Sequence, residues 1–327
     1  MTGNNLNSTH GFTLVELMVS MVLGLVISAA AVNIYLESRY SYQQDEELAR
    51  LQENGRFSLN YLKRELTLSG FLGGIRDKEN LGVSAVTTDC GDGTNWALDA
   101  SVPFDLLSDN DGATDLTSIN GIEWNCITPT ELESGSDVFS IKRTSDAPTL
   151  RNGNLQSDGE DLEQWYLRIF NYNQYNWSYI NTAIPTDDAT ADSGVDYWEY
   201  YAKIFYLRNY AVTSSDGIPT LCVRTLIGDD FSEQCLVEGI EDLQIEVGVD
   251  RDDNGTVEQY LNTPAAADFD DIRAVRLYLL VRSINEIPGY TNNKSYRLGQ
   301  TVIPAFNDGF IRRVFSTTIK LRNSGFS

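Results

Sequence analysis

The sequence predicts an α+β protein in which one long N-terminal helix packs against an antiparallel β-sheet. Two observations support this fold class. Residues 12–69 contain no proline and carry first an apolar run and then an apolar stripe at three- and four-residue steps, which is typical of one continuous helix. From about residue 200 onward, short segments with strand-like composition are separated by loops without helical patterns, so the sheet should be antiparallel.

The first half of the expected helix has the length and composition of a membrane span. The run from Phe12 to Leu36 is almost entirely apolar or small, and its length of about 25 residues is enough helix to cross a hydrocarbon core. It contains one acid, Glu16, and an acid inside a membrane segment is by default a functional-site hypothesis. An ordinary signal anchor or signal peptide is the alternative, but a signal peptide has a shorter apolar region, and neither explains Glu16.

The second half of the expected helix, Glu37 to Ser69, is amphipathic. Its apolar stripe consists of Leu48, Leu51, Gly55, Leu59, Leu62 and Leu66, and its polar face carries Glu46, Arg50, Glu53, Arg56, Lys63 and Arg64. Gly70 and Gly73-Gly74 provide the stop signal. A helix from Phe12 to Ser69 would be roughly 87 Å long, so its outer half must pack on the globular part of the protein.

The middle of the chain, about residues 75–200, is polar and irregular, and we expect it to be a large insertion. Two apolar segments within it, Val138–Ile141 and Trp165–Phe170, indicate short strands. The segment Asn171–Tyr179 places four aromatic residues among asparagines. These aromatics either cap the edge of a β core, which is the more common arrangement, or form an exposed contact surface.

Strand signals become clear after residue 200. The expected strands are Lys203–Tyr210, Thr220–Leu226, Leu243–Val249, Val275–Val281 and Arg313–Leu321. The helix needs its apolar stripe covered and this sheet needs one face covered, so packing one on the other satisfies both.

The composition excludes several classes of function. The chain has 327 residues, of which 42% are hydrophobic and 22% are charged, as expected for a globular protein with an anchor. Its formal net charge of -23 makes nucleic acid a poor partner. Its one histidine is His10, so if residues 1–11 are cleaved from the mature protein no histidine remains for triad catalysis or for a histidine metal site. We therefore expect no enzyme, and a membrane-anchored hydrolase is disfavoured.

The four cysteines suggest two disulfides in an exported protein. They are Cys90, Cys126, Cys222 and Cys235. Three connectivities are possible, and we favour Cys90–Cys126 with Cys222–Cys235 because they close the shorter loops. Four free thiols are the alternative.

An acidic segment begins at Asp250 and resembles half of an EF-hand loop. Asp250, Asp252, Asn254 and Glu258 take its first, third, fifth and ninth places, with Gly255 at the sixth and Leu261 instead of an acid at the twelfth. These four oxygen-bearing residues are a candidate calcium site, and no other cofactor is expected. The favoured alternative is a plain two-residue hairpin turn at Asn254-Gly255 between strands 243–249 and 256–261. Asp109, Asp111 and Asp115 form a similar, weaker cluster.

The N-terminal residues resemble those of a type IV prepilin. Gly11 is followed by Phe12, by an acid at Glu16, and by the long apolar helix. The resemblance implies that a membrane peptidase removes residues 1–11 as a leader and methylates the new amine of Phe12. It also implies that Glu16 serves assembly, since its carboxylate can pair with the N-terminal amine of a neighbouring subunit and so neutralise two charges in an apolar setting.

Three further stretches resemble the PilW family of minor pilins. They are Arg50–Phe57, Glu238–Ile245 and Arg312–Asn323. The resemblance implies a pilin fold and a low-abundance pilus subunit that joins other minor pilins and the major pilin, primes pilus assembly and lies at the tip. Such pili serve adhesion and twitching motility.

The expected organisation is a leader at 1–11, a helix at 12–70 with 12–36 in the membrane or filament core, and a periplasmic β-rich domain at 71–327. The protein would reside in the bacterial inner membrane before assembly and in the pilus at the cell surface afterwards. Two alternatives are a minor, J-type pseudopilin of a type II secretion system, which has the same N-terminus, and a pilus-associated adhesin whose middle insertion binds a receptor.

Overall fold

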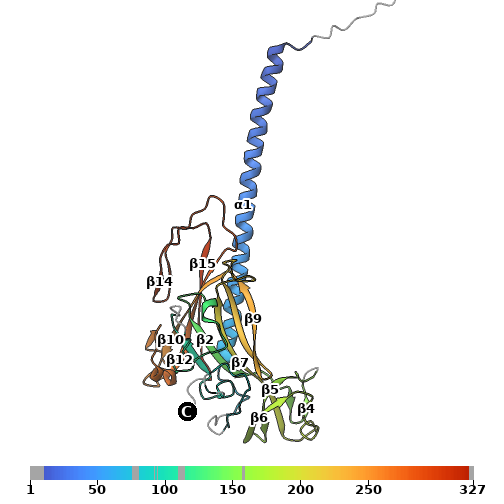
Figure 1. The fold of residues 1–327 in the computed structure, drawn as a ribbon, viewed down its shortest axis with the longest axis vertical. Coiled ribbons are helices and arrows are strands. Elements are labelled where there is room, and N and C mark those ends of the chain that lie inside the picture. Colours follow the sequence, from blue (N-terminus) through green and yellow to red (C-terminus); the bar gives the residue numbers. More distant parts are fainter. Residues whose placement is uncertain are drawn as a thin grey trace, which may run out of the picture.

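The structure is a computed structural model that describes residues 11–75, 81–91, 93, 95–109, 115–156 and 159–323. Its dominant element is helix α1, Leu14–Leu68, whose 55 residues form one continuous helix. The N-terminal half of α1 projects from the molecule, whereas its C-terminal half packs against the β domain (Figure 1). The helix ends at Leu68 with Ser69 as its C-cap, and Gly70 follows with a φ of 76°, a conformation that favours glycine. The expected single helix and its glycine stop are confirmed.

A nine-stranded antiparallel sheet forms the larger part of the β domain. Its strands are β1 Phe104–Leu107, β2 Val138–Thr144, β3 Leu150–Arg151, β4 Asn154–Leu155, β5 Gln164–Phe170, β6 Gln174–Ile180, β7 Val195–Arg208, β8 Thr220–Ile227 and β9 Asp230–Glu238. The 14-residue strand β7 organises this sheet. The first half of β7 pairs with β3 and β5, and its second half pairs with β2 and β8.

A second, four-stranded antiparallel sheet lies beside the first, in the order β11-β10-β12-β15. Its strands are β10 Ile240–Val249, β11 Gln259–Leu261, β12 Ile272–Arg282 and β15 Arg312–Lys320, and a separate hairpin consists of β13 Tyr296–Leu298 and β14 Thr301–Ile303. The chain crosses from β9 to β10 at Gly239, where φ is 79° and a Cβ would lie 2.8 Å from the carbonyl oxygen of Arg282. Two short 3-10 helices, η2 Pro129–Glu131 and η3 Ala266–Asp271, complete the described elements.

The main hydrophobic core lies between α1 and the two sheets. Leu51, Leu62 and Leu66 of the helix are buried together with side chains from β2, β7, β10, β12 and β15. Burial of each such leucine stabilises the fold by about 1.5–3 kcal/mol. The six polar-face residues expected on α1 are all exposed, which confirms the amphipathic pattern. The buried stripe also includes the polar residues Glu47, Ser58 and Glu65, which the apolar pattern alone did not indicate.

Residues 75–200 contain more regular structure than their composition indicates. The two short strands expected there are present as parts of β2 and β5, but β1, β3, β4, β6 and the first residues of β7 also lie in this segment. Most of these strands pair with β7 or with its neighbours. Their polar residues include Asp105, Gln164 and Asp196, which are buried, so strict apolar–polar alternation is absent.

Both expected disulfides are present in the structure. Cys90 is bonded to Cys126 across 36 residues, and Cys222 is bonded to Cys235 across 13 residues. No cysteine in the described part of the chain is free, so the four-thiol alternative is wrong for this structure. The second bond links directly paired positions of β8 and β9.

Candidate assembly interface

The N-terminal end of α1 places the residues of the predicted processing motif at an exposed helix start. Phe12 is 88% exposed and Gly11 precedes it directly. Thr13 is the N-cap residue, and its backbone N–H and its hydroxyl both donate to Glu16 Oε2, each at 2.8 Å. The Glu16 N–H donates in return to Thr13 Oγ1 at 3.3 Å. The Glu16 carboxylate is therefore held in a capping box beside the predicted cleavage point.

Among the described residues, the first half of α1 has no intramolecular packing partner. Every residue from 11 to 46 is exposed, and among the described residues α1 is the only helix long and apolar enough to cross a membrane. A helix that is apolar on all sides must be covered by lipid or by other helices. The apolar surface of residues 14–36 is thus available to lipid or to other helices.

The second half of α1 is joined to the large sheet by a buried ionic cluster. Arg143 of β2 donates to both carboxylate oxygens of Glu65, at 2.8 and 2.9 Å, and Lys203 of β7 donates to the same carboxylate at 3.1 Å. Burial alone would raise the pKa of Glu65, but the hydrogen bonds and positive charges of Arg143 and Lys203 outweigh it and lower that pKa below its usual value. The cluster orients the helix on the sheet.

A second polar contact holds α1 near the start of its packed half. The buried carboxylate of Glu47 accepts the backbone N–H of Ile284 at 3.0 Å and the side-chain amide of Asn285 at 2.8 Å. The segment that follows β12 is thereby fixed against the helix. Together with Glu65, this contact sets the direction in which the free half of α1 leaves the domain.

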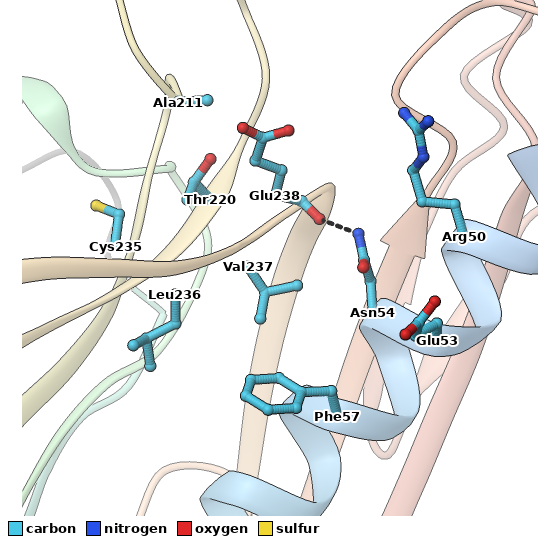
Figure 2. Close-up of a pocket in the computed structure, with 10 residues that line it drawn as sticks. All are labelled: Arg50, Glu53, Asn54, Phe57, Ala211, Thr220, Cys235, Leu236, Val237 and Glu238. Carbon is cyan, nitrogen blue, oxygen red and sulfur yellow. Dashed lines mark hydrogen bonds between the residues drawn. The ribbon is translucent and has the colours of Figure 1, made fainter.

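A groove of about 570 Å³ lies between α1 and the end of the β8–β9 hairpin. Figure 2 shows the helix on one side of it and strand β9 on the other. Asn54 bridges one end, because its side-chain amide donates to the backbone carbonyl of Glu238 at 3.0 Å. The apolar lining includes Phe57, which is 53% exposed, and the partly buried Leu236. The groove therefore combines an apolar surface with strand backbone.

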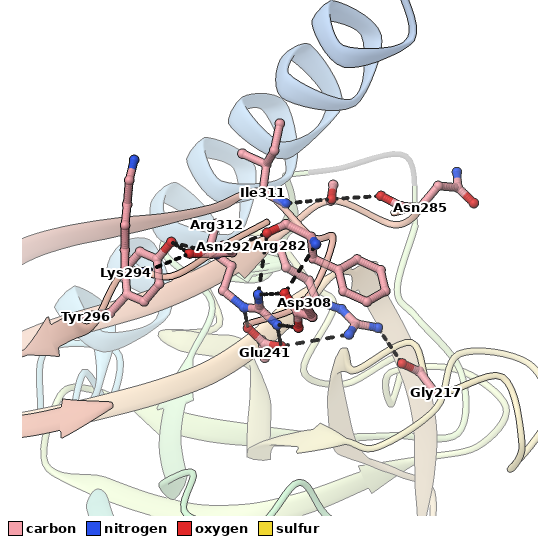
Figure 3. Close-up of polar contacts among 12 residues, drawn as sticks. Gly217, Glu241, Arg282, Asn285, Asn292, Lys294, Tyr296, Asp308, Ile311 and Arg312 are labelled. Carbon is pink, nitrogen blue, oxygen red and sulfur yellow. Dashed lines mark hydrogen bonds and ion pairs between the residues drawn. The ribbon is translucent and has the colours of Figure 1, made fainter. Parts of the chain in front are cut away.

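The second sheet carries a polar network around Arg312 at the start of β15 (Figure 3). The guanidinium donates to Glu241 of β10, with one contact of 2.8 Å, and to both carboxylate oxygens of Asp308 at 2.6 and 2.7 Å. Arg282 of β12 approaches the same Glu241 carboxylate at 3.8 Å. Burial would lower the pKa of Arg312, but its hydrogen bonds to Asp308 and Glu241 raise it above the usual value. The network ties β10, β12 and β15 together.

The three stretches that resemble PilW contact one another in space. The stretch on α1 reaches the second through the hydrogen bond from Asn54 to Glu238. It reaches the third through Gly55, where a Cβ would overlap the ring of Phe315. The second and third stretches are joined by the ion pair between Glu241 and Arg312. The family-like residues thus mark the junction of the helix with the C-terminal sheet, which local sequence patterns could not reveal.

The acidic loop between β10 and β11 brings together three of the four residues of the candidate calcium site. Carboxylate oxygens of Asp250, Asp252 and Glu258 lie within 4.8 Å of one another, and Asp250 is fully buried. These oxygens are ligands that suit calcium. The fourth residue, Asn254, instead uses its side-chain oxygen to accept the Thr256 N–H at 2.8 Å.

The expected two-residue turn at Asn254-Gly255 is wrong. The strands β10 and β11 do form an antiparallel hairpin, but β10 ends at Val249 and β11 begins at Gln259, so the connection spans residues 250–258. Positive φ occurs at Asp253 and Gly255 and not at Asn254, whereas a type I′ turn requires it at both central residues. The Asp250 carboxylate explains the difference, because it accepts the N–H groups of Asn254 and Gly255 at 3.0 and 2.8 Å and organises a longer loop.

Two other candidate segments are placed by the structure. In Asn171–Tyr179, Trp177 packs on Tyr200 with ring centroids 4.5 Å apart, and Tyr179 packs on Trp165 at 5.3 Å. Both rings cap the β core, as the common arrangement requires, while Tyr172 at the hairpin tip is 83% exposed. Of the second acidic cluster, Asp111 lies outside the described residues.

Comparison with known families supports the interpretation of both ends of the chain. Residues 204–323 match the family described as type IV pilus-assembly protein W, and residues 6–32 match the prokaryotic N-terminal methylation motif. A type IV-like pilin from Thermus thermophilus is similar in structure at 12% identity and a TM-score of 0.35, over 84% of this chain and 98% of that chain. No curated protein matches the chain. The family matches confirm the resemblance to type IV prepilins and to PilW, and the larger match is to a pilus-assembly family.

Proposed function

We propose that this chain, with its match to the type IV pilus-assembly protein W family and its N-terminal methylation motif, is a minor pilin that primes pilus assembly and lies at the pilus tip. The observation that carries the proposal is the free half of α1, which is exposed on all sides and begins with the prepilin-like motif. A prepilin peptidase would cut between Gly11 and Phe12 and methylate the Phe12 amine. The match to a pilus-assembly family favours the pilus over a secretion pseudopilus.

In this proposal the protein resides in the bacterial inner membrane, with the β domain in the periplasm, until it assembles with other minor pilins and the major pilin. The apolar half of α1 then exchanges lipid for neighbouring helices. Glu16 lies about one helical turn from Phe12, so its carboxylate is within reach of its own amine or of the amine of an adjacent subunit. Pairing between subunits would set the register, because apolar packing alone allows helices to slide.

The experiment that tests this role separates the charge of Glu16 from its capping function. Glu16→Val removes both, whereas Glu16→Gln removes the charge and keeps an oxygen that can cap the Thr13 N–H. We expect both variants to insert into the membrane and to be cleaved after Gly11, as mass spectrometry of the mature N-terminus would show. We also expect both to lose co-purification with other minor pilins and to reduce the number of surface pili.

Two outcomes would contradict the proposal. If the wild-type chain retains Met1 or is cut beyond Leu36, it is not processed as a prepilin. If Glu16→Gln co-purifies with partners and supports piliation as well as the wild type does, the carboxylate acts as a helix cap and not as the charge that directs assembly.

A further inference from the structure

Strand β9 has a free edge that faces the groove beside α1. Within the described part of the chain, β9 pairs with β8 only, so its other side carries main-chain groups without a strand partner. One of them, the carbonyl of Glu238, accepts the side-chain amide of Asn54 at 3.0 Å. The helix therefore already supplies one hydrogen bond of the kind that a neighbouring strand would supply.

The groove also offers a place for an apolar side chain. Phe57 of α1 is 53% exposed although it lies in the packed half of the helix, and Leu236 of β9, which lines the same groove, is only partly buried. A strand edge next to an apolar recess is the combination that binds extended peptides, since backbone pairing provides affinity and the recess selects alternate side chains. A helix placed here would leave the edge of β9 unpaired.

The ends of the described chain lie far from this groove. Asn323 donates to the carbonyl of Ser69, which is 15 residues from Asn54 and therefore about 22 Å further along α1. Gly11 lies beyond the other end of the helix, about 60 Å from Asn54. A segment adjoining either end is thus a poor occupant.

A second copy of this chain is also disfavoured. The edge strand carries the exposed acids Asp230 and Glu238, and two such edges would bring like charges together in a protein whose net charge is -23. The groove is rimmed by Glu53, Glu238 and Arg50, so it favours an uncharged or basic segment over an acidic one. A different chain fits these charges better.

We propose that an extended segment from the globular domain of a different, neighbouring pilin subunit lies in this groove, pairs with β9 and inserts an apolar side chain between Phe57 and Leu236. The inference rests on the proposed function and adds to it the surface that recognises a partner. Along α1, the groove begins at Arg50, a few residues after the free half of the helix ends. A neighbour whose helix packs along that free half would therefore hold its own globular domain beside β9.

Site-specific photo-crosslinking in cells that assemble the pilus tests the proposal. A benzophenone amino acid replaces Phe57 in the full chain, and in a matched control it replaces Ile227, which is 49% exposed. Ile227 pairs with Asp230 at the opposite end of the same hairpin, about 25 Å along β9 from the groove. We expect a crosslink from position 57 to another protein with an N-terminal methylation motif, mapped to an extended segment of its globular domain, and none from position 227.

A pair of substitutions tests the recess itself. Leu236→Glu should reduce the crosslinked product from position 57 at least tenfold, whereas Leu236→Ile should leave it unchanged. No crosslink at position 57, a crosslink to a second copy of this chain, a crosslink to a partner's helix, or an unaltered yield in Leu236→Glu would each overturn the proposal.

The design separates this inference from the proposed function. If the wild-type chain co-purifies with other pilins but position 57 gives no crosslink to them, the groove assignment fails and the minor-pilin role stands. If the wild-type chain does not associate with pilins at all, the proposed function fails first.

Discussion

At the scale of single residues, the charged groups inside this protein separate into paired and unpaired carboxylates. Glu65 is buried, but Arg143 and Lys203 neutralise it. Asp242 on β10 accepts a hydrogen bond from the side-chain amide of Gln244 at 3.0 Å and has no cation bonded to it in the described residues. Burial, together with the negative charges of Glu241 and Asp109, raises the pKa of Asp242 to about 7. Removal of a cation beside Glu65 should therefore destabilise the protein, whereas removal of the Asp242 charge should stabilise it.

Removal of Arg143 should be costly. Arg143→Met leaves Glu65 buried with only Lys203 to balance it, and breaking a buried pair in this way costs about 3–5 kcal/mol, here at the lower end. Arg64→Met is the matched control, because Arg64 pairs with Asp146 at 3.2 Å on the surface, where such pairs contribute about 0–1 kcal/mol. Denaturant unfolding of both variants measures the difference, and equal losses would show that the buried cluster does not hold the helix.

Removal of the Asp242 charge should stabilise the protein at neutral and alkaline pH. The folded state keeps a proton that the unfolded state releases near pH 4, so this contribution is complete below pH 4 and is lost as the pH rises through 7. Asp242→Asn keeps an acceptor for Gln244 and should raise stability at pH 8 by about 2 kcal/mol, less than the full shift implies because Asp242 is partly exposed.

Thermal melting at pH 4 and pH 8 checks the expectation for Asp242. The variant and the wild type should agree at pH 4 and diverge at pH 8. The exposed residue Asp187 provides the control, since Asp187→Asn should shift the melting temperature little at either pH. A wild-type protein that is as stable at pH 8 as the variant would contradict the assignment.

At the scale of elements, the loop 250–258 is organised by its own acids. Asp250 and Glu258 both accept backbone N–H groups of the loop, and with Asp252 they form one group of three carboxylates. Such a group is held together against its own charge repulsion by hydrogen bonds. A divalent cation would remove that repulsion, and the donor set consists of the oxygen ligands that calcium prefers.

Calcium should raise the melting temperature of the protein if the loop binds it. At a concentration of 100 times the dissociation constant, binding stabilises the folded state by about 2.7 kcal/mol, and a chelator should reverse the effect. Asp250→Asn should abolish the response, whereas Asp253→Asn, in the same loop but outside the carboxylate group, should retain it. A melting temperature that is indifferent to millimolar calcium and to chelator would show that hydrogen bonds alone hold the loop.

Local sequence patterns predicted those elements that are specified by residues close together in the chain. The helix has a periodic stripe, and strands such as β12 are runs of mostly apolar residues that favour strands, so both were found from the sequence. Strand β9 was missed because it lacks a simple apolar–polar alternation, and its Glu233 pairs instead with Arg208 of β7 and Arg224 of β8. The turn at Asn254 was misjudged because the buried Asp250 carboxylate, and not the dipeptide, determines the backbone there.

The candidate site depended still more on distant pairings. In the sequence, Gly55 is one position of an apolar stripe. Only the structure shows that the ring of Phe315 occupies the space that a larger side chain at position 55 would need. Glu241 and Arg312 are 71 residues apart in the chain. No periodicity links them, and family resemblance pointed to both stretches without indicating that they touch. Contacts of this kind follow from the packing of the whole chain.

At the scale of the whole molecule, the placement of α1 has a mechanical consequence. The helix lies along the β domain over its C-terminal half, with β15 as its main neighbour. A pull on the N-terminal half along the helix axis would therefore act in shear on this interface. Under an axial pull, many contacts would bear the force at the same time, including the Glu65 cluster and the close packing of Gly55 against Phe315. A sideways pull would instead break these contacts one after another. The protein should resist axial force far better than transverse force.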